Sequence, residues 1–464
     1  MKIYNTLTRK KEDFNTIEEG VARIYVCGPT VYNYIHIGNA RPIVVFDTLR
    51  RYLLYKGYDV RFVSNFTDID DKIINKAKDE NVPFKEITEK YINAYLEDTK
   101  SLNIFEEHTI HPKATEFIPE MVKFVADLEE KNAAYNVDGN VYFDISKSKN
   151  YGMLSKKNID ELKAGARIEA GVEKRNPLDF ALWKKRKEES EPAWESPWGM
   201  GRPGWHIECS VMAKSILGDT IDIHAGGEDL QFPHHENEIA QSETLTGKKF
   251  SNYWMHNGMI NVDNRKMSKS LDNFFLVRDI AKKYDGEIMR LWLLSAHYRN
   301  PINFSEEVME QTKNALERLY NAKEKLERLV EVANDGEDAA IVQAIDKSKI
   351  EFETAMDDDI NTADAVASLF EIVRIINTEI NETTPRAALQ YAYDNFILLA
   401  DVLGLLYRES EKSLDSRIEA LIKERNEARA SKNYARADEI RDMLKAEGIE
   451  LKDTPAGVIW KKVD

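Results

Sequence analysis

Residues 22–72 read ARIYVCGPTVYNYIHIGNARPIVVFDTLRRYLLYKGYDVRFVSNFTDIDDK. The run at 23–27 is rich in β-forming residues, and the Cys-Gly-Pro-Thr sequence that begins at its last residue breaks it. Residues 41–57 have the periodicity of a helix that stops at a glycine, and residues 58–65 have the composition of a second strand. A strand, a helix and a strand in this order form a βαβ unit, which predicts a parallel sheet with helices on its faces.

The flanking sequence predicts that this α/β domain is interrupted. Residues 115–200 depart from the pattern, because their strands look antiparallel and are followed by a polar stretch punctuated by Pro and Gly. Strand, Gly-rich turn and helix then return. We therefore expect an α/β fold with a Rossmann-like, parallel-sheet catalytic domain. Its halves are residues 1–114 and 201–304, and residues 115–200 form an inserted connective subdomain.

The C-terminal third is expected to be mainly helical. Residues 305–334 predict a long amphipathic helix opened by a serine cap, and similar patterns continue to residue 409. We interpret residues 305–409 as a helical bundle. Residues 410–464 contain two basic-rich helical patterns and a closing hairpin pattern, and they predict a small mixed α/β module.

Composition narrows the class of protein. Hydrophobic residues make up 42% of the 464, which is enough for several cores, and the net charge of −16 argues mildly against nucleic acid as a partner. No segment approaches the ~18 apolar residues of a membrane span. The first residues contain no apolar export signal. We expect a cytoplasmic protein without membrane contact.

A candidate metal site begins with FPHHENEIAQSE at residues 232–243. His234 and Glu238 are four apart and would share one face of a helix, although His235 with Glu238 remains an alternative. The alternative to a metal site is a solvated helix start. Cys27 lies at the C-terminal end of the first predicted strand, and Cys209 lies near the return to the α/β domain. Both could converge on the sheet edge near His234, where Cys, Cys, His and a carboxylate would form a candidate zinc set.

Two further motifs indicate a nucleotide site. His36, Gly38 and Asn39 lie at the predicted turn into a helix, whose N-terminus favours phosphate. The polar stretch NRKMSKSLDN at residues 264–273 has two lysines that suit the charge of a phosphoryl or nucleotidyl transition state. An ordinary glycine loop and a generic basic loop are the alternatives. Both of these alternative interpretations lose most of their support when the two motifs occur together in one chain.

The paired motifs HIGN and KMSKS resemble the signature of class I aminoacyl-tRNA synthetases. One departure is Asn39, where the fourth residue of the motif is often histidine. The sequences YVCGPTVYNYIHIGNARP, SNFTDIDDK, LDFALWK, GRPGWHIECS, HAGGEDLQFPHHENEIAQSE and DTPAGVIW together resemble the cysteinyl-tRNA synthetases, essentially from end to end.

The resemblance implies ATP-dependent attachment of L-cysteine to tRNA(Cys). Cysteine is first adenylated and then transferred to the 3′-terminal adenosine. It also implies one Zn²⁺ per chain, Mg²⁺ with ATP, and a monomer. The positions that match the family's zinc ligands are Cys27, Cys209, His234 and Glu238.

The resemblance further implies roles for residues around the substrates. The amino-acid pocket would contain Thr67, Trp205 and Asp229, with His224 close by. The ATP site would contain His36, Gly38, Asn39, Trp254, His256, Gly258, Lys266, Met267, Ser268, Lys269 and Ser270, of which His36, Asn39, Lys266 and Lys269 would be catalytic. Trp254 could equally be plain core. Residues 410–464 would bind the anticodon, with Arg436, Asp438, Asp453 and Trp460 as candidate tRNA contacts.

Three rival functions are compatible with parts of this sequence. The chain could be a relative that joins cysteine to an amino sugar, but such relatives lack a full anticodon module. It could hold tRNA without catalysis, but a mere binder needs neither KMSKS nor zinc. It could be a small-molecule nucleotidyltransferase, which would not need the helical bundle. The basic residues of the C-terminal module could also form a solvated helical face.

Overall fold

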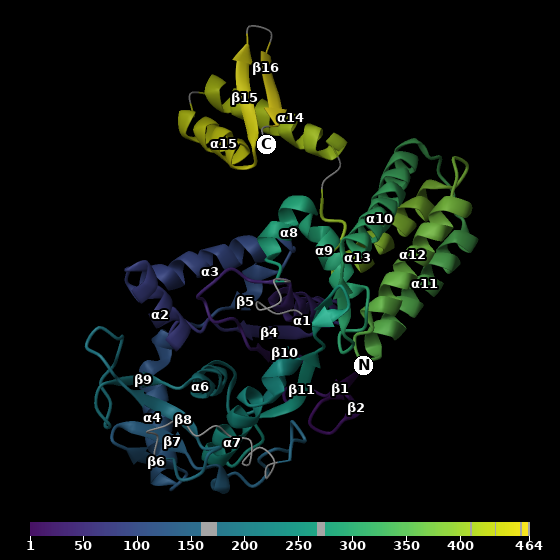
Figure 1. Ribbon diagram of the computed structural model, residues 1–464. Helices are drawn as coiled ribbons and strands as arrows, with labels where there is room; N and C mark the ends of the chain where they lie inside the picture. Colours follow the sequence, from purple (N-terminus) through teal and green to yellow (C-terminus); the bar gives the residue numbers. More distant parts are fainter. Residues whose placement is uncertain (159–173, 267–273, 409–410, 432, 455–456, 463–464) are drawn as a thin grey trace. The chain divides into compact units, whose positions relative to one another are not determined.

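The computed structural model describes residues 1–464 except 159–173, 267–273, 409–410, 432, 455–456 and 463–464. The chain divides into two compact units, residues 1–406 and residues 407–464 (Figure 1). Within the described residues, no helix combines the length and the apolar character that crossing a membrane requires.

The centre of the first unit is a parallel sheet of five strands in the order β11-β10-β3-β4-β5. The strands are β3 (Val21–Val26), β4 (Asp59–Ser64), β5 (Thr109–Ile110), β10 (Ile221–Gly227) and β11 (Ser251–Asn257). Helix α1 (Ile37–Tyr55) connects β3 to β4, which confirms the predicted βαβ unit. Strand β3 pairs with β10 across the insertion, so residues far apart in the chain end at one sheet edge.

The insertion is antiparallel, as predicted. Its sheet has the order β6-β7-β8-β9, formed by β6 (Ala134–Val137), β7 (Asn140–Phe143), β8 (Phe180–Lys185) and β9 (Gly201–Pro203). Helix α4 (Ile118–Glu130) precedes it, and α6 (Trp205–Leu217) leads the chain back to the parallel sheet. Helices α4, α6 and α7 (His234–Thr246) pack together, and their buried side chains share one hydrophobic cluster with residues of β3, β4, β10 and β11.

Shorter elements complete the first unit. The N-terminal hairpin is β1 (Lys2–Asn5) with β2 (Lys10–Asp13), and a second small sheet has the order β13-β12-β14. Its strands are β12 (Ile260–Val262), β13 (Arg265–Lys266) and β14 (Ile302–Phe304). The remaining helices before the bundle are α2 (Asp71–Glu80), α3 (Phe84–Ser101), α8 (Val277–Lys283) and α9 (Gly286–Leu294).

The helical part of the first unit contains four long helices. They are α10 (Glu306–Val332), α11 (Ala339–Asp357), α12 (Thr362–Thr378) and α13 (Arg386–Val402). Ser305 caps α10 as predicted, because its side chain accepts a hydrogen bond from the backbone N–H of Val308. The bundle shares one continuous hydrophobic core with the sheet, so α1 is held between the two.

The second unit has its own small core. Helices α14 (Glu411–Ala430) and α15 (Tyr434–Ala446) precede the antiparallel hairpin of β15 (Ile449–Thr454) and β16 (Gly457–Lys462). Ile418, Ile440, Leu444 and Ile449 are buried together. Two helices and a hairpin are the elements that the sequence predicted here.

Candidate metal centre and nucleotide cleft

Three elements bring the predicted metal ligands together. Cys27 follows β3 directly, at the carboxyl end of the sheet, and its backbone N–H donates to the carbonyl of Ala225 at 3.1 Å. Cys209 lies on α6, the helix that returns from the insertion. His234 and Glu238 lie one helical turn apart on α7. The convergence that the sequence predicted is therefore found.

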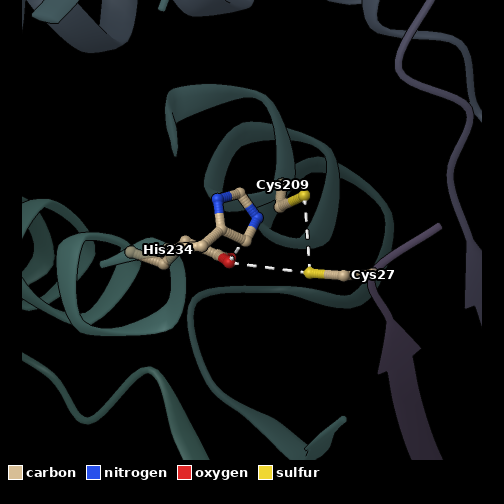
Figure 2. Close-up of side chains that lie close together, drawn as sticks. Cys27, Cys209 and His234 are labelled. Carbon is tan, nitrogen blue, oxygen red and sulfur yellow. Dashed lines mark hydrogen bonds and ion pairs between the residues drawn. The ribbon is translucent and has the colours of Figure 1, made fainter. Parts of the chain in front are cut away.

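The four side chains form a compact, mostly buried cluster. The sulfur of Cys27 lies 3.7 Å from the sulfur of Cys209 and 3.6 Å from Glu238 Oε1. His234 Nε2 lies 3.1 Å from the same carboxylate oxygen. Figure 2 shows the two sulfur atoms and the His234 ring facing a common centre. One ligand atom from each residue lies within 4.8 Å of all the others.

Further histidines surround this cluster. His224 Nε2 lies 2.9 Å from Glu238 Oε2, and His235 Nε2 lies 3.3 Å from the sulfur of Cys27. A second set of donors with metal-site geometry therefore exists, formed by Cys27, His224, His235 and Glu238. The alternative use of His235, which the sequence left open, thus has a structural counterpart.

Burial sets the protonation of these groups. It raises the pKa of Cys27 and of Glu238 well above their ordinary values, so both favour their protonated forms. It lowers the pKa of His224 to about 3 and the pKa of His234 well below its ordinary value. The imidazoles are therefore neutral, which is the form that binds metals.

The donor set fits a zinc ion. Thiolate, imidazole and carboxylate are the ligands that Zn²⁺ takes in proteins. Two sulfurs at about 2.3 Å from a tetrahedral centre lie roughly 3.8 Å apart, close to the sulfur separation in this cluster. The other nitrogen of His234, Nδ1, lies 3.0 Å from His206 Nδ1, a contact that fixes the ring with Nε2 toward Glu238.

A cavity of about 360 Å³ opens beside the cluster. Cys27 forms part of its wall. Trp205 and Asp229, predicted for the amino-acid pocket, also line it. The Trp205 ring stacks on His234 with a centroid distance of 4.2 Å. The same cavity is lined by the nucleotide-site candidates His36, Gly38, Asn39 and Gly258. The amino-acid and nucleotide candidates therefore share one cleft.

The HIGN sequence forms the start of α1, as predicted. Asn39 Oδ1 accepts a hydrogen bond of 3.2 Å from the backbone N–H of His36, which ties the first turn together. This contact commits the amide oxygen of Asn39 to the helix start. The amide N–H₂ group of Asn39 is then the end of the side chain that can donate to a phosphate oxygen.

Other predicted site residues lie behind the cavity wall. Thr67 is buried, and its hydroxyl donates to Glu208 Oε2 at 2.9 Å. Trp254 is buried and stacks on His224 with a centroid distance of 4.5 Å. His256 is buried and hydrogen-bonds to His235 at 2.8 Å and to Thr6 at 2.8 Å. None of these three residues lines the cavity.

The KMSKS stretch falls mostly outside the described residues. Lys266 ends β13, and Met267, Ser268, Lys269 and Ser270 lie in the undescribed range 267–273.

The predicted tRNA contacts belong to the second unit. Arg436 pairs with Glu424 at 2.9 Å, and Asp438 pairs with Arg441 at 2.9 Å. Trp460 packs against the small core, and Asp453 lies on β15.

Several residues of the site were not found from the sequence. Asn65 is fully buried, and its Oδ1 accepts from the backbone N–H of Gly28 at 3.0 Å. A Cβ atom on Gly28 would lie 1.7 Å from the Asn65 carbonyl oxygen, so only glycine allows this close approach beside Cys27. The quoted motifs contain Asn65 and Gly28. No periodicity or spacing, however, marks them as neighbours of a metal cluster.

The fold resembles solved class I synthetases. The methionyl-tRNA synthetase of Mycobacterium tuberculosis, in complex with methionyl-adenylate, matches 82% of this chain and 89% of its own, with a TM-score of 0.57 and 14% identity. At this identity the likeness concerns the fold alone.

Sequence similarity identifies the family much more specifically than the fold does. The cysteine–tRNA ligase of Finegoldia magna is 66% identical over 462 residues, and that of Clostridioides difficile is 54% identical over 467 residues. Both matches cover 100% of each chain.

Three family models match successive parts of the chain. Residues 13–314 match the class I (C) tRNA synthetase catalytic domain, and residues 351–407 match the DALR domain. Residues 411–460 match the cysteinyl-tRNA ligase anticodon binding domain. The chain therefore belongs to the cysteinyl-tRNA ligase family, a branch of the class I tRNA synthetases.

Proposed function

We propose that this ligase holds one zinc ion with Cys27, Cys209, His234 and Glu238 and uses it to bind the thiolate of its amino-acid substrate. The chain is a cysteine–tRNA ligase, with cysteine, ATP and tRNA(Cys) as substrates. The proposal adds how the enzyme recognises cysteine.

The observation that carries the proposal is the position of Cys27. It belongs to the buried donor set, and it also forms part of the cavity wall that Asp229 and Trp205 line. A cysteine whose ammonium group pairs with the Asp229 carboxylate could therefore direct its thiol toward the donor set. A zinc-bound thiol ionises near neutral pH, whereas a serine hydroxyl is a much poorer ligand. A pocket that recognises its substrate by shape alone discriminates between near-isosteres by only ~10–200-fold.

We assign the remaining groups of the cleft to ATP. The N-terminus of α1 favours phosphate, and His36 and Asn39 would donate to phosphate oxygens there, with Mg²⁺ accompanying the nucleotide. Gly258 and the backbone around it would lie by the adenosine. Lys266 and Lys269 would stabilise charge in the adenylation transition state. Thr67, His224, Trp254 and His256 would act from behind the cavity wall by supporting the residues that line it.

We further propose that residues 410–464 contact tRNA, and that the enzyme acts as a monomer in the cytoplasm. The match of residues 411–460 to an anticodon binding domain supports the first part. Sedimentation of the purified chain with and without tRNA tests whether the enzyme is a monomer. A dimer in the absence of tRNA contradicts it.

X-ray absorption at the zinc edge tests the mode of cysteine recognition. The zinc-loaded protein should gain one sulfur scatterer when cysteine is added, and it should gain none with an equal concentration of serine. Before cysteine is added, the zinc should already have two sulfur scatterers, from Cys27 and Cys209, whereas the second donor set contains only one sulfur. An unchanged zinc environment on cysteine addition would make the metal purely structural.

A further inference from the structure

Tyr25 lies beside the metal cluster but is not one of the proposed ligands. It precedes Cys27 by two residues on β3, so its side chain leaves the strand on the same face as that of Cys27. The side chain is fully buried in the hydrophobic cluster that also contains Cys209. Its ring packs against His224 with a centroid distance of 5.3 Å.

The hydroxyl group of Tyr25 has no hydrogen-bond partner among the described residues. Its electrostatic neighbours are Cys209, Cys27 and Glu238, and Cys209 is the one placed to interact with the hydroxyl itself. A buried phenol normally has a partner, because leaving such a group unpaired costs stability. Among the described residues, this buried hydroxyl therefore lacks the hydrogen-bond acceptor that such a group normally has.

A charged hydrogen-bond acceptor would give the Tyr25 hydroxyl a partner. Cys209 binds a metal only as a thiolate, which then accepts hydrogen bonds. Besides the other proposed ligands, Asn65 Oδ1 lies near this sulfur, at 3.7 Å, and the backbone N–H of Gly28 holds that oxygen in place. A carbonyl oxygen donates no hydrogen bond, so Asn65 does not stabilise the thiolate. Tyr25 carries a hydroxyl donor within the same buried cluster as Cys209.

We propose that the Tyr25 hydroxyl donates a hydrogen bond to the Cys209 thiolate when the cluster holds zinc. Tyr25 is then a positioning residue for the metal centre, and the inference rests on the proposed zinc site. A hydrogen bond to a charged sulfur is stronger than one between neutral groups. It would offset the burial of the thiolate charge, orient the Cys209 side chain and reduce the electron density that this sulfur gives to the metal.

The Tyr25→Phe variant tests this proposal. It keeps the ring and removes only the hydroxyl, so the metal-free protein should melt at the same temperature as wild type or higher. Zinc affinity, measured on the full-length chain by competition with a chromophoric chelator, should fall by about 10–100-fold, as is usual when a group that supports a metal ligand is lost. In the cobalt-loaded variant, the thiolate-to-cobalt charge-transfer band should move to longer wavelength.

Tyr135→Phe is the matched control. It also removes one buried phenol hydroxyl, which donates to Asp179 Oδ2 at 2.6 Å in the inserted sheet. This variant should keep wild-type zinc affinity and the wild-type cobalt band. If Tyr25→Phe matches wild type in both measurements, the Tyr25 inference is wrong while the zinc site stands.

If Tyr25→Phe destabilises the metal-free and zinc-loaded proteins equally, the hydroxyl is a packing group and the inference is again wrong. If the wild-type protein itself binds no zinc, both the inference and the site on which it rests fail.

Discussion

The sulfur atoms of Cys27 and Cys209 lie 3.7 Å apart, although the two residues are 182 positions apart in the chain. Strand β3 delivers the first thiol to the sheet edge, and α6 delivers the second as the chain returns from the insertion. Both thiols then face α7, which supplies His234 and Glu238. All four ligands therefore come from the two halves of the catalytic domain that flank the insertion in the chain.

The first prediction distinguishes the two donor sets. If zinc is held by the proposed set, Cys209→Ser and His234→Gln should each reduce the bound zinc from one per chain to well below one after dialysis. His235→Gln removes a member of the rival set only, and it should retain zinc. Elemental analysis of the purified variants measures this directly.

The opposite result would assign the metal to the second donor set. If His235→Gln loses the metal while Cys209→Ser and His234→Gln keep it, the ion lies between Cys27, His224, His235 and Glu238. Circular dichroism of each variant provides the control for folding.

Sequence periodicity predicted the parts of the site that depend on regular geometry. The spacing of His234 and Glu238 placed them on one helical face, and the position of Cys27 as the last residue of a β-rich run placed it at the end of a strand. Because parallel strands end at a common edge, their convergence could be expected. The antiparallel insertion followed in the same way from a change of pattern.

The rest of the site depends on packing between distant segments. Nothing in a strand pattern indicates that the Tyr25 ring packs against His224, or that His224 contacts the second carboxylate oxygen of Glu238. Trp254 illustrates the same limit, because an apolar residue in a buried strand has the same pattern whether it faces a ligand or a histidine ring. Such contacts follow only from how β10, β11 and α7 pack.

The second prediction concerns Lys269. Lys269→Ala should lower the rate of adenylate formation by roughly 10²-fold or more, because the role proposed for this lysine is to stabilise charge in the transition state. The affinity for cysteine should barely change. Lys282→Ala is the control, since this exposed lysine pairs with Asp279 on α8 and should not affect the rate. Adenylate formation at the wild-type rate in a rapid-quench experiment would remove Lys269 from the mechanism.

The third prediction concerns the second unit. A chain that ends at Arg408 omits α14, α15 and the hairpin, whose small core is their own. It should retain ATP–pyrophosphate exchange, which needs only the cleft of the first unit. It should lose most of its efficiency in charging tRNA, and tRNA binding should depend less steeply on salt. Normal charging by the shortened chain would mean that the basic residues of this unit form only a solvated face.

The last prediction concerns Asp47, which lies on α1 below the HIGN turn. Its buried carboxylate pairs with Arg50 on the same helix, with Arg51 at 2.9 Å and with Arg290 on α9 at 2.7 Å. Arg290 in turn donates to the carbonyl of Leu403, so this network joins α1 to the end of the bundle. Asp47→Asn leaves buried guanidinium groups without their anion and should lower the free energy of unfolding by about 3–5 kcal/mol.

The pH dependence identifies the cause of that loss. Burial alone would raise the pKa of Asp47, but its three guanidinium partners lower it by more, so the pKa lies below its ordinary value. The carboxylate therefore contributes its full stability above about pH 4, near the unfolded pKa, and loses it as the pH falls toward the folded pKa. In urea titrations, the difference between wild type and Asp47→Asn should be the same at pH 7 and pH 5 and should shrink below about pH 4. Asp401→Asn is the control, because Asp401 pairs with Arg51 at 3.3 Å from an exposed position, and its loss should cost less than about 1 kcal/mol at any pH. An equal effect of the two variants would show that the buried network does not anchor α1 to the bundle.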